Sequence, residues 1–89
     1  ALFFHLHSLL VLNFIEKTLA RARYEYDPSI KQWAAWVEGF PGVYAQGRNV
    51  EAARQELGSV LEEYILLSVR EGRRIPGFAF STKLHAKIS

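Results

Sequence analysis

The amino-acid sequence predicts an α+β fold in which strands lie between two helices. Alternating side chains along residues 31–38 predict an extended strand, and the turn-forming residues 39–42 end it. Asn49 is a helix N-cap residue, and the amphipathic pattern of residues 50–71 after it predicts a long helix. Apolar side chains at helical spacing in residues 12–22 predict a shorter helix before the strands.

Length and composition limit the classes of function. The chain has 89 residues, 49% of them hydrophobic, and a formal net charge of +2. At this length we expect one domain with a small core, so exposed aromatic side chains become candidate interface residues. So low a net charge attracts nucleic acid only weakly. The absence of cysteine excludes disulfides and thiolate zinc sites, and it favours a cytoplasmic location.

The amino-terminal end is strongly apolar. Residues 1–15 are fewer than the roughly 20 that a membrane-spanning helix needs, so no membrane partner is expected. Residues 1–11 are interpreted as an apolar arm, frayed or packed against a partner, and residues 12–89 as a single domain. His5 and His7, two apart on an extended stretch, could share a metal with His85. Without a carboxylate or cysteine partner they are more typical of surface residues, so no metal and no cofactor is predicted.

Four strands are predicted in all. The first three cover residues 23–27, 31–38 and 43–46, and their short connections favour an antiparallel meander. Residues 78–81 alternate again after a proline-glycine turn and predict a fourth strand. The predicted order is helix, three strands, long helix and strand.

The second strand presents apolar side chains on both faces. If one face packs on the core, Ala34 and Trp36 lie on the other. A large apolar ring there needs a cover, which the amino-terminal helix or a second subunit can supply. Trp36, with Ala34 and Tyr44, is therefore predicted to form a partner or oligomer interface, as in a dimer or tetramer. The core-facing set is Trp33, Ala35 and Val37.

The long helix carries one apolar stripe and a glycine in its interior. Gly58 costs roughly 1 kcal/mol relative to alanine there, which favours a close approach to another backbone, such as the sheet. Gly72 is expected to end the helix. The predicted stripe is Ala53, Leu57, Val60, Leu61, Tyr64, Leu67 and Ser68.

Four segments, in this order and spacing, resemble the HicB-like antitoxin family: GFPGVYAQG, NVEAA, LEEYILL and EGRRIPGF. The resemblance covers roughly residues 24–77. It implies a HicB-like domain with a partial ribonuclease H fold, in which the fourth strand runs parallel to the first. Pro41 and Gly42 carry much of the resemblance and are expected to be structural. The other residues given a structural role are Trp33, Val37, Gly47 and Asn49.

The resemblance also implies a function. HicB-like proteins bind and mask HicA, a small mRNA-cleaving toxin with an active-site histidine. Many members add a carboxy-terminal DNA-binding segment, and the residues after Pro76 are too few for one, so direct DNA binding is not expected. The predicted function is a non-catalytic antitoxin that binds and neutralises a HicA-like toxin. The alternative is a stand-alone domain without a cognate toxin, either self-assembling or RNA-binding.

The residues allow two other kinds of site, a nuclease centre and a nucleic-acid contact. A ribonuclease H site needs several converging carboxylates, but Glu25, Asp27 and Glu38 are more typical of solvated strand charges, so no catalytic residue and no enzyme activity is predicted. Arginines at two helix ends could contact nucleic acid beside the tyrosines of the first strand. Helix-dipole complementation and solubility are the simpler explanation. These arginines are Arg21, Arg23, Arg73 and Arg74.

Overall fold

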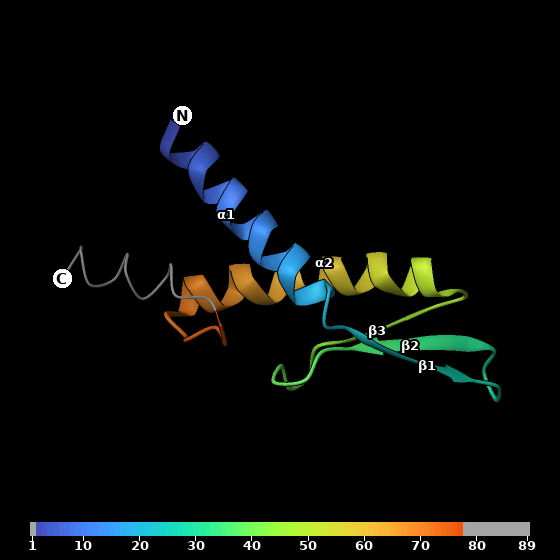
Figure 1. Cartoon of the computed structure of the whole chain (residues 1–89). Helices are drawn as coiled ribbons and strands as arrows, with labels where there is room; N and C mark the ends of the chain where they lie inside the picture. The colour runs from blue at the N-terminus through green and yellow to red at the C-terminus, as the bar shows by residue number, and fades with distance from the viewer. Residues whose placement is uncertain (1, 78–89) are drawn as a thin grey trace.

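The computed structural model describes residues 2–77, with side chains from Leu9 onward (Figure 1). The elements are α1 (Leu2–Leu19), β1 (Arg23–Asp27), β2 (Gln32–Trp36), β3 (Tyr44–Gly47) and α2 (Val50–Glu71). The strands form one antiparallel sheet in the order β1-β2-β3. The α+β class and the meander are therefore confirmed, while the fourth strand predicted at 78–81 lies outside the described residues.

Both helices lie on the same side of the sheet, and α2 packs directly on it (Figure 1). We call the side of the sheet that faces α2 the inner face. Ala35 is fully buried there and Val37 is 3% exposed, while Trp33 packs against the core from a half-buried position. The predicted assignment of these three side chains to the core is confirmed.

Both ends of α2 are capped as the sequence predicted. The side-chain oxygen of Asn49 accepts a hydrogen bond of 2.7 Å from the backbone N–H of Ala52. Gly72 adopts a left-handed conformation with φ of 71°, and its backbone N–H donates to the carbonyl oxygen of Val69. Because the left-handed region disfavours side chains, glycine is the natural residue at this helix end.

The buried stripe of α2 differs from the predicted one at its carboxyl end. Ile65, which the prediction omitted, is fully buried, whereas Leu67 is 48% exposed. Ile65 follows Leu61 by four residues and so stays on the core side, but a step of six turns Leu67 away from it. Val60 and Tyr64 are partly buried against the core. The fully buried residues are Ala53, Leu57, Leu61, Ile65 and Ser68.

The close approach of backbones occurs at Gly47, and the prediction that placed it at Gly58 is wrong. A Cβ atom added to Gly47 would lie 2.4 Å from the backbone nitrogen of Ala53, at the start of α2. A Cβ atom on Gly58 would instead lie 3.6 Å from a side-chain methyl of Leu19, which is an ordinary contact with α1. Helix propensity alone did not reveal which glycine lies against a neighbouring backbone.

α1 is longer at its start and shorter at its end than predicted. It begins at Leu2 rather than near Leu12, so the predicted arm is helical backbone, and it ends at Leu19 rather than near Ala22. The extended stretch on which a shared metal site for two histidines depended is therefore not formed. Within residues 2–77, neither helix combines the length and hydropathy that crossing a membrane requires.

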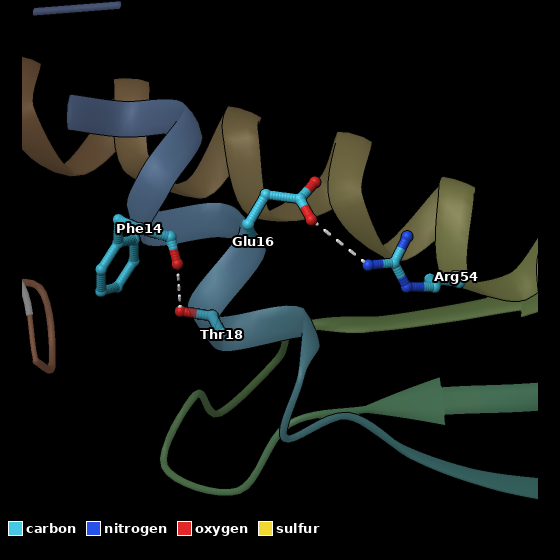
Figure 2. Close-up of polar contacts among 4 residues, drawn as sticks. All are labelled: Phe14, Glu16, Thr18 and Arg54. Carbon is cyan, nitrogen blue, oxygen red and sulfur yellow. Dashed lines mark hydrogen bonds and ion pairs between the residues drawn. The ribbon is translucent and has the colours of Figure 1, made fainter. Parts of the chain in front are cut away.

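The carboxyl half of α1 packs against α2, and its amino end leans away from the other elements (Figure 1). The buried side chains are Phe14, Ile15, Thr18 and Leu19. The buried hydroxyl of Thr18 has a hydrogen-bond partner within the helix, because it donates to the carbonyl oxygen of Phe14 at 2.8 Å. Across the two helices, Arg54 forms an exposed ion pair of 3.5 Å with Glu16 (Figure 2). Leu12, one of the apolar side chains at helical spacing that predicted this helix, is instead 56% exposed.

The turn between β2 and β3 contributes a core residue that the sequence analysis treated only as a shape requirement. Phe40 is 4% exposed, and its ring centroid lies 6.2 Å from that of Phe14 and 5.7 Å from that of Tyr64. Gly39 and Gly42 have φ values of 91° and 80°, which permit the bends on either side of it. The turn thus binds the sheet to both helices.

We expect Gly47→Ala to lower the free energy of unfolding by about 1–3 kcal/mol, the usual cost of overpacking, because its Cβ atom would overlap the backbone of α2. Gly58→Ala is the matched control, and it should raise stability by up to about 1 kcal/mol through helix propensity. Urea denaturation followed by circular dichroism measures both. Equal effects of the two substitutions would contradict the assigned contact.

Candidate functional site

The face of the sheet turned away from α2, here called the outer face, is covered by neither of the two helices (Figure 1). Strand alternation and the register of the sheet place an aromatic pair on this face, in the row next to the turn between β2 and β3. Trp36 and Tyr44 are direct cross-strand partners. Ala34 and Gln46 form the next pair on the same face, two residues further along each strand. The residues of this face are Arg23, Glu25, Asp27, Gln32, Ala34, Trp36, Tyr44 and Gln46.

The Trp36–Tyr44 pair is accessible to a partner. Tyr44 is 51% exposed, and Trp36 is half-buried. The Nε2 group of Gln46 donates a hydrogen bond of 3.1 Å to the phenol oxygen of Tyr44, which holds that side chain along its strand. Trp36 points away from the core as predicted. α1 is not its cover, however, because α1 packs against α2 on the opposite side of the sheet.

Two shallow hollows flank this pair. The first, which we call the outer-face hollow, has a volume of about 420 Å³ and is lined from all three strands. Glu25 and Asp27 come from β1, Ala34 and Trp36 from β2, and Tyr44 from β3. The second, of about 360 Å³, lies between the same aromatic pair and the turn of residues 37–43. The predicted interface residues Trp36, Ala34 and Tyr44 are thus brought together.

The three predicted strand carboxylates do not form one cluster: Glu25 and Asp27 line the outer-face hollow, whereas Glu38 lies in the turn after β2. Glu38 lies 3.8 Å from Arg23 in an exposed ion pair, and Asp27 accepts hydrogen bonds from the backbone N–H and the hydroxyl of Ser29. Glu25 makes no ion pair within the described part of the chain. Over those same residues, no group of three or more histidine, aspartate or glutamate side chains is placed to hold a metal ion. The arrangement resembles a polar rim rather than a two-metal site.

The four arginines proposed as a nucleic-acid patch lie in two places. Arg21 and Arg23 follow α1, where they line a hollow with Val37 and Glu38. Arg73 follows α2 and pairs with Glu71 at 2.7 Å, with Arg74 next to it. Figure 1 shows that the turn after α1 lies near the middle of α2, whereas the exit from α2 lies at its far end. The fold therefore divides these charges into two small groups.

The residues given a structural role differ in their surroundings. The Trp33 ring lies 5.4 Å from that of Tyr26, and Val37 is buried. Pro41 is exposed in the turn between buried Phe40 and the left-handed Gly42. What sequence reasoning missed is the place of Glu25 beside the aromatic pair. Glu25 is paired with Ala34 across the β1–β2 register, which the pattern of a single strand does not determine.

Comparison with known proteins identifies the family. The family model described as UPF0150-like matches residues 13–76, which include all three strands and α2. The chain belongs to the UPF0150-like family. A crystal structure of TTHA0281 from Thermus thermophilus, also similar to this chain, has 26% sequence identity, a TM-score of 0.70, and a match to 78% of this chain and 91% of that one. No curated protein matches the chain. The matched span leaves out the first turns of α1.

We expect substitution of Trp36 to leave the fold of this family member nearly unchanged. Trp36→Thr should lower the free energy of unfolding by about 1 kcal/mol at most, the usual range of one cross-strand pair. Leu57→Ala, at a fully buried position of α2, should cost about 2–5 kcal/mol. Thermal or urea unfolding of both variants measures the difference. Comparable losses would mean that Trp36 belongs to the folding core and not to an interaction surface.

Proposed function

We propose that the protein is a HicB-like antitoxin, a non-catalytic binding module that neutralises a HicA-like mRNA-cleaving toxin. The observation that carries the proposal is the Trp36–Tyr44 pair on the outer face, which neither helix covers, in a chain of the UPF0150-like family. Aromatic side chains are enriched in the cores of protein interfaces and supply much of their binding energy. The resemblance of the turn and helix motifs to HicB-like antitoxins supplies the identity of the partner.

The chemistry of the outer face supports binding over catalysis. Of the three carboxylates, only Glu25 and Asp27 line the same hollow. Glu38 pairs with Arg23, and Asp27 accepts hydrogen bonds from Ser29. A hydrolytic site would need acids, a nucleophile or metal ligands held within reach of one substrate atom. A shallow, aromatic and partly polar surface is what a folded partner contacts. In this proposal the domain acts by occupying the surface with which the toxin would otherwise bind mRNA.

The division of the arginines disfavours RNA binding by the domain itself. Electrostatic binding of RNA needs several cations along one path of phosphates, and each neutralised phosphate steepens the salt dependence. Here Arg23 and Arg73 each lie within an ion pair, at separate places on the molecule. Self-association is the alternative that an observation favours. Leu9 and Leu12 on α1 are 53% and 56% exposed, and a second copy could cover them.

The decisive experiment is co-expression with the product of the gene adjacent to this chain's gene. We expect that protein to copurify with the domain and to arrest growth when it is expressed alone. Trp36→Ser should abolish the rescue of growth and weaken the complex by tenfold or more, about 1.4 kcal/mol, as expected for an aromatic anchor. Leu66→Ser, which removes an exposed apolar side chain from α2, should rescue growth like the unaltered domain. The proposal is wrong if the neighbouring protein neither binds nor is neutralised.

Self-association is tested by the mass of the protein in solution. If α1 mediates it, Leu12→Glu should convert the oligomer to a monomer, because a charge replaces an exposed apolar side chain at the contact. If the outer face mediates it, Trp36→Ser should do so and Leu12→Glu should not. Size-exclusion chromatography with light scattering gives the mass. A monomeric unaltered domain would contradict both arrangements.

A further inference from the structure

The outer-face hollow is a shallow recess of about 420 Å³, large enough to receive a long side chain of a partner. Its floor includes the small side chain of Ala34, with the aromatic pair beside it and the β1 carboxylates on the other side. Ala34 lies between Glu25 on β1 and Gln46 on β3 in the register of the sheet. A methyl group at the centre of the face leaves space that a longer side chain would fill. The hollow therefore exists because alanine occupies this position.

The charge of the hollow is negative. Glu25 and Asp27 line it, and no lysine or arginine is among the residues that do. The nearest arginine along β1 is Arg23, whose guanidinium lies 3.8 Å from Glu38, towards the turn that follows β2. Asp27 is held by the hydrogen bonds from Ser29, but Glu25 forms no ion pair within residues 2–77. Glu25 is thus the carboxylate available to a cation from outside.

The aromatic pair adds a second attraction for a cation. The faces of tryptophan and tyrosine rings carry negative electrostatic potential, and a cation within about 6 Å of a ring centroid is attracted to it. The hydrogen bond from Gln46 orients the Tyr44 side chain along β3, which reduces the side-chain entropy that binding would cost. Arginine suits such a recess better than lysine, because its planar group stacks on rings and pairs with carboxylates through two hydrogen bonds.

We propose that the outer-face hollow receives one arginine side chain of the partner, stacked on Trp36 and Tyr44 and paired with Glu25. This inference rests on the proposed function for the identity of the partner, because a protein that acts on mRNA must carry cationic side chains to bind phosphates. An antitoxin that captures one of those side chains both gains affinity and removes a phosphate contact. The acidic lining of the hollow is complementary to that basic surface.

The experiment titrates the ¹⁵N-labelled domain with acetyl-Gly-Arg-Gly-amide and follows the indole N–H of Trp36 by NMR. The Trp36→Phe variant assigns that signal against the one from Trp33. We expect a saturable shift at Trp36 with a dissociation constant in the millimolar range. The corresponding citrulline peptide keeps the planar group but has no charge. It should bind at least about fivefold more weakly than the arginine peptide. Equal binding of the two peptides, or no saturable shift, would overturn the proposal.

Two variants test the assigned contacts. Glu25→Gln removes the charge with little change of shape. It should weaken binding of the arginine peptide about three- to tenfold. Glu63→Gln, on the exposed side of α2, makes the same change of net charge and should leave affinity unchanged. Ala34→Leu fills the hollow and should abolish the shift while the α2 signals keep their positions. Identical affinities of the Glu25→Gln and Glu63→Gln variants would overturn the role of Glu25.

The outcomes for the hollow and for the proposed function are separable. If the arginine peptide binds and the neighbouring gene product does not, the hollow is supported and the antitoxin function fails. If the neighbouring protein binds the unaltered domain and the Glu25→Gln variant equally well, the antitoxin function stands and the arginine inference is overturned.

Discussion

The contact between the end of β3 and the first turns of α2 determines how the other elements pack. Gly47 places no side chain between the strand and the backbone of Ala53, and Asn49 caps the helix where it begins. Both constraints act on the backbone, so they position the helix over the sheet independently of any one core side chain. The buried stripe of α2 then meets the inner face, and a two-layer fold results.

The asymmetry of the sheet follows from a second contact. Phe40 reaches from the turn after β2 to Phe14 of α1 and Tyr64 of α2, so both helices lie on the inner side. Nothing within the described residues covers the other side, although β2 carries apolar side chains on both. The alternation along β2 therefore separates two roles: Ala35 and Val37 contribute to the core, and Trp36 to a surface. A strand that is apolar on one face only would have had no such surface.

The features that could be predicted from the sequence were local in origin. Turn residues and period-two alternation predicted the meander, and Asn49 and Gly72 marked the ends of α2. The start of α1 was missed because residues 1–11 are mostly apolar and their few polar residues do not mark one polar face. Gly58 was preferred over Gly47 because propensity is read within one element, whereas the contact with Ala53 joins two. In the candidate site Trp36 was found from alternation, but Glu25 depends on strand register.

Contacts within the sheet position the side chains of the outer face for the binding proposed above. Gln46 holds Tyr44, and the Arg23–Glu38 pair keeps the nearest cation beside the turn and leaves Glu25 to face the hollow. Because these contacts belong to the sheet, a partner can bind without repacking the inner side, and the entropy lost on association is correspondingly smaller. A ligand that binds only the folded state at 100 times its dissociation constant adds about 2.7 kcal/mol of stability. For a domain with so small a core this is a large share of the total, so a partner bound as proposed would also stabilise the fold.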